Sequence, residues 1–315
     1  MTTLSLKQLN KIPVRLASGH RLCAGCAEGI IAKQILMGTE SEVVVSLSTG
    51  CFEVSTTVYP YTSWNTSFVH TAFGNGAATC AGVETAYKAL KKKGKVTEDI
   101  KFVNFAGDGA TYDIGLQALS GAMERGHNMM YVCMNNEAYM NTGIQRSSAT
   151  PLGASTTTSW AGSEQAGKKE FSKDMTAIMV AHNIPYVAQV SPHNWRDTVT
   201  KASKGFEVDG PAFINSISPC PRGWRFPSDR TVDMARLAVE TCVWPLFEVV
   251  DGEYTLTGES AKIASGKMEK KPVTDWFAPQ GRFKHLLTEK NEPVVEAYQA
   301  EVDRRWNKLI KLSEL

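Results

Sequence analysis

This sequence of 315 residues lacks three features that mark other classes of protein. No apolar run approaches the roughly 20 residues that a membrane-spanning helix needs, so we expect no membrane segment. The formal net charge is only +2, and this balance argues against binding to nucleic acid or to an anionic membrane. The first residues contain no continuous apolar core of an export signal, so the cytoplasm is the expected location.

The composition is that of an ordinary folded protein, with 43% hydrophobic and 21% charged residues. Seven cysteines, an odd number, occur in a chain without an export signal. Cytoplasmic cysteines are more often metal ligands, redox groups or small core residues than disulfide partners.

Short apolar runs rich in β-branched residues alternate with helical patterns between residues 40 and 215. This alternation predicts an α/β fold with a mainly parallel sheet that helices cover on both faces. Such sheets bind ligands at the carboxyl ends of their strands. The expected strands lie at 42–47, 101–106, 129–134 and 211–215, and the clearest helices at 76–93 and 113–125.

Two later stretches depart from this alternation. Residues 146–173 are rich in Ser, Thr and Gly and predict a long ordered loop. Residues 251–285 are polar, are interrupted by Gly and Pro, and lead to a final helix near 290–311. We therefore expect a main domain at residues 1–250, followed by a C-terminal arm and helix at 251–315.

Polar residues follow two of the expected strands where each one ends. Asp108 lies in a Gly-Asp-Gly turn directly after one strand, and Asn136 follows the next strand along the chain. Parallel strands end at one edge of a sheet, so these side chains should lie side by side. Carboxylate, amide and carbonyl oxygens suit Mg²⁺, and glycines allow backbone N–H groups to approach phosphate. Each stretch alone could be an ordinary turn, but their pairing favours a magnesium–phosphate site.

This pairing resembles the thiamine-diphosphate-binding motif, which opens with Gly-Asp-Gly and closes with an Asn-containing turn. The resemblance implies that Asp108 and the side chain of Asn136 bind Mg²⁺, together with the backbone carbonyl of Ala138. It also implies that the cofactor contacts the turn after the strand, at Gly107, Asp108, Gly109 and Ala110.

The longer run from Asn136 to Gly143 is similar to the metal-binding turn of the pyruvate:ferredoxin oxidoreductase family. This similarity places Asn141 near the reacting carbon of the cofactor and makes it the expected catalytic residue. It also counts Asn136, Ala138 and Asn141 among the cofactor-binding residues.

Four of the cysteines form a second pattern. Cys23 and Cys26 form a C-x-x-C pair, Cys51 follows the first expected strand, and Cys220 follows the strand at 211–215. Residues at strand ends can face the ligand edge of the sheet. Four thiolates there could hold a [4Fe–4S] cluster or a Cys₄ zinc site, and position alone does not choose between them.

The cysteine arrangement also resembles the 2-oxoacid:ferredoxin oxidoreductase family, in which matching cysteines ligate a cluster. The resemblance implies that Cys23, Cys26, Cys51 and Cys220 hold one [4Fe–4S] cluster. It further implies that Glu28 and Cys51 lie beside thiamine diphosphate. The other cysteines match no ligand position and are expected to be small buried residues, namely Cys80, Cys133 and Cys242.

The likeness to β subunits of this family covers nearly the whole chain, including residues 58–62, 113–121 and 280–285. It implies an enzyme subunit that acts in the oxidative decarboxylation of a small 2-oxoacid on thiamine diphosphate. Electrons would pass to the cluster and then to external ferredoxin. Residues 64–70 are more polar than expected for the pyruvate enzymes, and residues 74–76 replace a stretch that is usually more acidic there. Oxalate and branched-chain 2-oxoacids therefore stay open as substrates beside pyruvate.

Two absences imply partner chains. The sequence offers no second α/β unit large enough to bind the aminopyrimidine ring, which a separate subunit binds in the resembled family. It also lacks the C-x-x-C-x-x-C-x-x-x-C-P run of ferredoxin-like modules. We therefore expect activity only with a pyrimidine-binding subunit and a two-cluster ferredoxin-like subunit.

Two alternatives compete with this interpretation. A non-redox thiamine-diphosphate decarboxylase or synthase would need no set of four cysteines, so Cys51 and Cys220 speak against it. A zinc-binding, non-catalytic module would leave the Gly-Asp-Gly and Asn-Asn pairing as coincidence.

Overall fold

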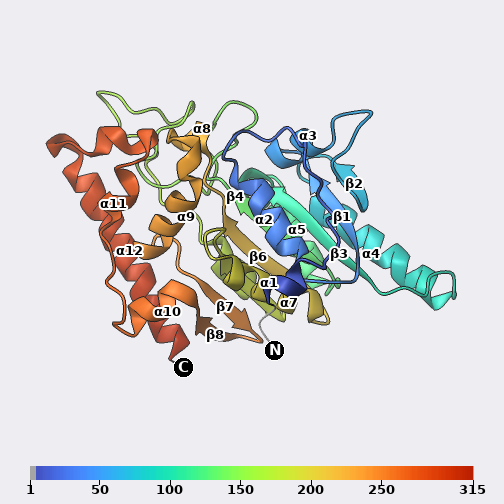
Figure 1. Cartoon of the computed structure of the whole chain (residues 1–315). Helices are drawn as coiled ribbons and strands as arrows, with labels where there is room; N and C mark the ends of the chain where they lie inside the picture. Colours follow the sequence, from blue (N-terminus) through green and yellow to red (C-terminus); the bar gives the residue numbers. More distant parts are fainter. Residues whose placement is uncertain (1–4, 315) are drawn as a thin grey trace.

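The computed structural model describes residues 5–314 and places their eight strands in one sheet (Figure 1). The strand order is β2-β1-β3-β4-β6-β5-β7-β8. Neighbouring strands from β2 to β5 are parallel, whereas β7 is antiparallel to both β5 and β8. The strands are β1 Glu42–Ser48, β2 Ser67–Thr71, β3 Ile100–Gly107, β4 Met130–Asn135, β5 Tyr186–Val190, β6 Ala212–Ile217, β7 Phe247–Val250 and β8 Glu253–Leu256.

All four strands expected from the sequence are present, as β1, β3, β4 and β6. Every residue of β4 and β6 is buried, because helices cover both faces of the parallel part of the sheet. The remaining strands were not expected from the sequence. β2 has no fully buried residue, and β7 and β8 have only four residues each, so their hydrophobic patterns are weak.

Helices pack against the sheet from both sides, and this confirms the predicted architecture. Val103 and Phe105 of β3 contact the core beneath α2 and α7, whereas Phe102 and Ala106 contact the core beneath α4 and α5. This alternation follows from the two-residue period of a strand. The helices are α1 Leu6–Leu9, α2 Ala27–Leu36, α3 Cys51–Thr56, α4 Gly76–Lys92, α5 Leu116–Glu124, α6 Met175–Val180, α7 Trp195–Glu207, α8 Pro221–Trp224, α9 Thr231–Glu240, α10 Gly258–Ala264, α11 Val273–Phe277 and α12 Glu292–Ser313.

Several short helical turns complete these elements. A π-helical turn at Gly109–Asp113 carries the chain from β3 toward α5. The 3₁₀ turns lie at Ser228–Arg230, Gly281–Leu286 and Glu289–Asn291. Between β4 and α6 the chain forms neither helix nor strand, as the composition of residues 146–173 predicted.

The C-terminal part packs against the edge of the sheet that β7 and β8 form. β8 pairs with β7, and α12 contacts β8 and α11. α12 stands at one end of the molecule, and α4 projects from the other (Figure 1). The division expected at residue 250 falls in the turn between β7 and β8 and stays a prediction.

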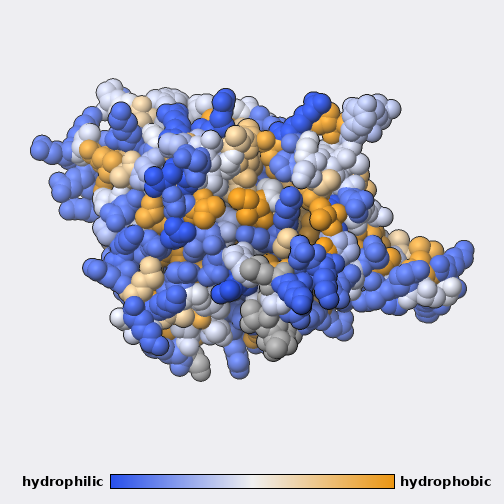
Figure 2. Space-filling model, viewed as in Figure 1, coloured by the Kyte–Doolittle hydropathy of each residue, from blue (hydrophilic) through white to orange (hydrophobic). Residues whose placement is uncertain are grey.

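Hydrophilic residues cover most of the face shown in Figure 2, and apolar residues reach that surface in small separate groups. Within residues 5–314, no helix combines the length and the apolar character that crossing a bilayer requires.

Candidate functional site

A cavity of ≈ 270 Å³ lies at the carboxyl ends of β1, β3 and β4. The strands deliver their following turns to this edge, as expected for a parallel sheet. The lining includes most of the residues singled out from the sequence: Glu28, Cys51, Gly107, Asp108, Gly109, Asn136, Ala138 and Asn141. Ala110 is buried in the π-helical turn and is not among the lining residues.

The carboxyl group of Asp108 is the most unusual polar group in this cavity. Its side chain is only 1% exposed, and Ser147 Oγ donates a hydrogen bond of 2.5 Å to Oδ2. The other oxygen, Oδ1, is buried and has no hydrogen-bond partner among residues 5–314. Burial raises the pKa of Asp108 to about 8 because the ionised form loses its hydration. A cation beside Oδ1 would both pair this oxygen and favour the ionised form.

The glycines on either side of Asp108 have different surroundings, and only Gly107 borders open space. A Cβ atom at Gly109 would come within 2.3 Å of the Tyr139 ring, so a side chain does not fit there. At Gly107 no atom lies within 4 Å of the position a Cβ would take, so the backbone borders open space. A phosphate group could therefore approach this backbone closely.

Asn136 connects this turn to the N-terminal part of the chain. Its Nδ2 donates to Glu28 Oε1 at 3.2 Å, and the sulfur of Cys26 lies 3.7 Å from Glu28 Oε2. Glu28 is 3% exposed, and burial raises its pKa to about 7. One buried carboxyl group thus contacts both a residue of the expected metal turn and a residue of the expected cysteine set.

The turn after Asn136 is held by a buried ion pair that the sequence reasoning missed. Glu137 has a φ of 66°, which is strained for a residue other than glycine. Its Oε2 accepts a hydrogen bond of 2.6 Å from Arg282, whose guanidinium lies 3.9 Å from the centre of the Trp224 ring. Trp224 Nε1 donates to the backbone carbonyl of Asn136 at 2.8 Å. Residues from the C-terminal third therefore fix the turn.

Asn141 lies further along the same segment, at the rim of the cavity, and its side chain is exposed. Ala138 is buried in the turn itself. The structure thus brings Asp108, Asn136 and Ala138 together inside the cavity and leaves Asn141 accessible from outside.

The four expected cluster cysteines come from three separate parts of the fold. Cys26 precedes α2, Cys51 begins α3, and Cys220 precedes α8. Burial raises the pKa of Cys51 above its usual range, and negative charge on Glu28, Cys220 and Cys23 would raise it further. Cys51 and Glu28 line the same cavity, and Cys26 Sγ lies 3.7 Å from Glu28 Oε2. None of these four thiols is fully buried, whereas Cys80, Cys133 and Cys242 are.

Gly25 ties the C-x-x-C loop to the region of Cys220. It has a φ of 75°, and a Cβ atom there would lie 2.0 Å from the backbone oxygen of Ser228. Thr231 Oγ1 donates to the carbonyl of Gly25 at 2.5 Å. Only glycine fits this close approach, which holds Cys23 and Cys26 near the segment that follows β6.

Across residues 5–314, no three His, Cys, Asp or Glu side chains have the close spacing that holds a single metal ion.

Comparisons with known proteins identify the family of the chain. Residues 48–216 match the family model of the thiamine pyrophosphate enzyme, C-terminal TPP binding domain. The pyruvate synthase subunit PorB of Thermotoga maritima is 46% identical over 99% of this chain and 97% of its own length. PorB of Methanosarcina barkeri is 47% identical over 93% of this chain and 95% of its own length. The chain belongs to the 2-oxoacid:ferredoxin oxidoreductase β-subunit family.

Other members of this family have different names. The ketoisovalerate oxidoreductase subunit VorB of Pyrococcus horikoshii is 41% identical over 95% of this chain and 93% of its own length. A solved structure of a 2-oxoglutarate:ferredoxin oxidoreductase from Magnetococcus marinus has a TM-score of 0.54 at 20% identity, covering 70% of this chain and 79% of that one, and shows a shared fold.

These findings confirm the predicted family, fold and enzyme class, and they confirm a thiamine-diphosphate-binding domain. The β-subunit family acts in oxidation, so the non-redox enzyme and the zinc-binding module no longer compete. The individual ligand and cofactor contacts stay predictions.

Proposed function

We propose that this β subunit holds the diphosphate of thiamine diphosphate through Mg²⁺ and carries one [4Fe–4S] cluster during the oxidative decarboxylation of a small 2-oxoacid. The observation that carries the proposal is the buried, unpartnered Oδ1 of Asp108, in one cavity with Asn136. A buried carboxylate oxygen without a partner is costly unless a cation pairs with it.

The Mg²⁺ ligands proposed from this chain are Asp108, the side-chain oxygen of Asn136 and the backbone carbonyl of Ala138. All are hard oxygen donors, and phosphate oxygens would complete the octahedron. Ser147 holds the second oxygen of Asp108, so only Oδ1 remains to face the ion. The Arg282–Glu137 pair keeps the turn that carries the other two ligands in place.

The backbone around Gly107, Gly109 and Ala110 is proposed to receive the diphosphate. Glu28, Cys51 and Asn141 would lie nearest the reactive ring, with Asn141 orienting the substrate from the rim of the cavity. Bound there, thiamine diphosphate would supply the electron sink that loss of CO₂ from a 2-oxoacid requires.

Cys23, Cys26, Cys51 and Cys220 are the proposed cluster ligands. Three observations support this set: Cys51 lines the cofactor cavity, Cys26 lies beside Glu28 of that cavity, and Cys220 follows a strand of the parallel sheet. The oxidative chemistry of the family supports an iron–sulfur cluster, which accepts electrons, rather than zinc, which has no redox chemistry.

Pyruvate is the proposed substrate, because relatives with 46% and 47% identity are pyruvate synthase subunits. The subunit with 41% identity acts, by its name, on ketoisovalerate. The test is dye reduction by the assembled complex with pyruvate, 2-oxoisovalerate, 2-oxoglutarate and oxalate, each with and without coenzyme A. Fastest turnover with another acid would overturn the choice of pyruvate but not the oxidative chemistry.

Three partners are proposed: a pyrimidine-binding subunit, a two-cluster ferredoxin-like subunit and external ferredoxin. Large aromatic side chains are exposed in the segment between α3 and β2 and in the segment between β4 and α6. We propose that they contact the partner subunit that completes the cofactor site. Tyr59 is 94% exposed, Tyr61 77% and Trp160 61%.

The cytoplasm is the proposed location, and residues 1–250 are the proposed cofactor-binding domain.

Dependence on partners is tested by comparing the isolated chain with the assembled complex. The chain alone, with its cluster reconstituted, is expected to oxidise no 2-oxoacid, and addition of the partner subunits should restore activity. Sustained turnover by the chain alone would overturn the proposal of a shared site.

A further inference from the structure

The long loop at residues 146–173 contributes a short turn that touches the proposed Mg²⁺ site. Residues 147–150 form this turn, in which the backbone N–H of Thr150 donates to the carbonyl of Ser147 at 3.2 Å. We call it the clasp, because it is hydrogen-bonded to both chain segments that carry the proposed ligands. Ser147 and Thr150 are 0% exposed, so water does not compete for their hydrogen bonds.

The two hydroxyl groups of the clasp reach different ligand segments. The carbonyl of Glu137 can only accept, so Thr150 Oγ1 donates its hydrogen to it, at 2.7 Å. Thr150 Oγ1 then accepts from the backbone N–H of Ser147 at 2.9 Å. Ser147 Oγ donates to Asp108 Oδ2 at 2.5 Å. One turn is therefore bonded both to the first proposed ligand and to the residue that separates the other two.

Asp113 forms a second link between the same parts of the chain. It lies in the π-helical turn that follows Asp108. Its Oδ2 accepts from the backbone N–H of Ser148 in the clasp at 3.0 Å and from the hydroxyl of Tyr139 at 3.1 Å. Tyr139 directly follows Ala138. The clasp and the two ligand segments are thus joined by hydrogen bonds at two places.

A buried lysine supports the clasp from the side opposite the ligands. Lys168 is 3% exposed, and its Nζ donates to the carbonyl of Thr150 at 2.6 Å. The backbone N–H of Lys168 donates to Ala154 at 3.1 Å, and its carbonyl accepts from Gly153 at 2.8 Å. A loop without helix or strand is therefore fixed across its own width.

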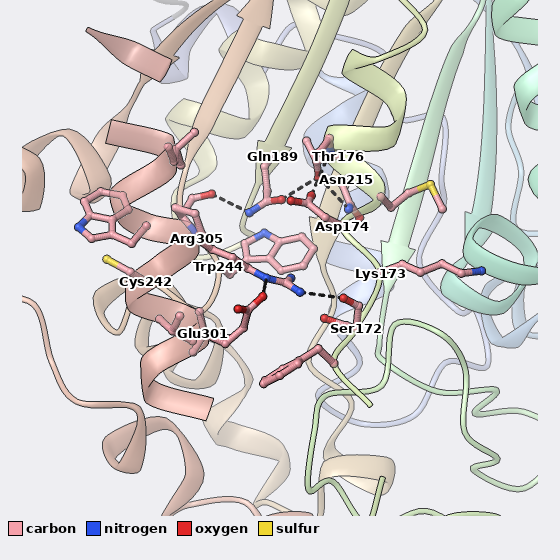
Figure 3. Close-up of a pocket in the computed structure, with 18 of the residues that line it drawn as sticks. Ser172, Lys173, Asp174, Thr176, Gln189, Asn215, Cys242, Trp244, Glu301 and Arg305 are labelled. Atoms are coloured by element: carbon pink, nitrogen blue, oxygen red, sulfur yellow. Dashed lines mark hydrogen bonds and ion pairs between the residues drawn. The ribbon is translucent and has the colours of Figure 1, made fainter. Parts of the chain in front are cut away.

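The end of the loop is also anchored, beside a second cavity of ≈ 170 Å³ that lies between it and α12 (Figure 3). Arg305 of α12 donates to the carbonyl of Ser172 at 2.9 Å, and Glu301 accepts from Arg305 Nε at 2.6 Å. The next residue, Lys173, donates from its backbone N–H to the carbonyl of Ser148 at 3.0 Å. The anchored end thus holds the clasp directly.

We propose that the clasp makes the metal site selective for Mg²⁺ over Ca²⁺, with Thr150 as a positioning residue; this inference rests on the Mg²⁺ site proposed above. Mg²⁺ demands a near-ideal octahedron with ligands at about 2.0–2.1 Å, whereas Ca²⁺ accepts about 2.3–2.6 Å and irregular geometry. A site discriminates between them only if its ligands cannot move apart. The ligand segments follow two different strands, and the clasp ties one segment to the other beyond the strand ends.

The test uses the assembled complex after removal of its metal and thiamine diphosphate. Titration calorimetry gives the Kd of thiamine diphosphate with saturating Mg²⁺ and with saturating Ca²⁺. The ratio of the Ca²⁺ value to the Mg²⁺ value is the readout, because a general loss of stability raises both constants together. Thr150→Val removes the hydroxyl and keeps the shape. It should lower the ratio about fivefold, which is the effect of one buried hydrogen bond on an equilibrium constant.

Three further variants complete the test. Thr150→Ser keeps the hydroxyl and should keep the ratio of the unaltered complex. Lys168→Met removes the support of the clasp and should lower the ratio as Thr150→Val does. Thr241→Val is the matched control, since Thr241 is 0% exposed and its hydroxyl donates to the carbonyl of Leu237 at 2.8 Å, outside the cofactor cavity. It should lower Tm and leave the ratio unchanged.

An unaltered complex that binds thiamine diphosphate equally well with both cations would overturn the proposal. So would a Thr150→Val complex that binds more weakly with both but keeps the ratio, because the hydroxyl would then only stabilise the fold. Asp108→Ala separates these outcomes from a failure of the proposed metal site, which normal Mg²⁺-dependent binding in that variant would show. If Thr150→Val does not assemble, Lys168→Met decides the question by the same ratio.

Discussion

Replacing Arg282 by Met removes one partner of the ion pair that holds the proposed metal turn. Arg282 is 3% exposed and Glu137 4%, and their contact is 2.6 Å. Loss of one partner leaves a buried, unpaired carboxylate, which costs about 3–5 kcal/mol. For a chain of this size, that loss lowers Tm by about 5–8 °C. Met retains much of the stacking volume against Trp224, so the change reports mainly on charge.

The same substitution should weaken binding of thiamine diphosphate. Without Arg282, the strained backbone at Glu137 is free to relax, and Asn136 and Ala138 move with it. Calorimetric titration with thiamine diphosphate and Mg²⁺ should therefore give a larger Kd. Arg304→Met, at an exposed ion pair with Glu301, is the matched control and should change neither Tm nor Kd appreciably.

A double-mutant cycle with Glu137→Gln decides whether the pair is the cause. The combined variant leaves no buried charge unpaired, so it should be more stable than Arg282→Met alone. If the two single effects simply add, to within about 0.5 kcal/mol, the residues are not coupled and the account of the turn is wrong.

Three further predictions concern the remaining groups. Asp108→Ala should abolish Mg²⁺-dependent retention of thiamine diphosphate and leave the cluster's visible absorption intact; normal retention would refute the metal assignment. Cys220→Ser should lose the electron paramagnetic resonance signal of the reduced cluster and Cys133→Ser should keep it, whereas the reverse pattern would mean a wrong fourth ligand. His193, whose Nε2 lies 3.5 Å from Glu259 Oε2, and a hydrogen bond from Asn194 lower the pKa of Glu259 from 4.5 to about 2. The contribution of Glu259 to stability is therefore complete above pH 4.5 and is lost as the pH falls toward 2. In Glu259→Gln, Tm should therefore fall less steeply over that range.

The meeting of Asp108 and Asn136 at one edge of the sheet could be predicted because each residue directly follows a strand. β3 and β4 are consecutive in the chain and adjacent in the sheet, so Asp108 and Asn136 had to meet once both strands were recognised. Cys51 and Cys220 also follow strands, and parallel strands end at the same edge. Local pattern was sufficient wherever a residue's position is set by the strand immediately before it.

The residues that fix the site could not be found in this way. Arg282 lies 145 positions from Glu137, and Ser147 lies 39 positions from Asp108. Neither has a local pattern that predicts its contact, because both come from segments without regular periodicity. The second cavity has the same origin: its floor belongs to the sheet and its wall to α12, which only tertiary packing brings together.

Glu28 shows why the two sequence patterns belong to a single site. From the sequence, the Gly-Asp-Gly turn and the cysteines were separate motifs with separate ligands. In the structure, one oxygen of Glu28 accepts from Asn136 and the other lies beside Cys26. A shift of the metal turn therefore changes the surroundings of a proposed cluster ligand, and the reverse also holds. We therefore expect Arg282, which holds the turn without contacting a proposed ligand, to influence the binding of both proposed cofactors.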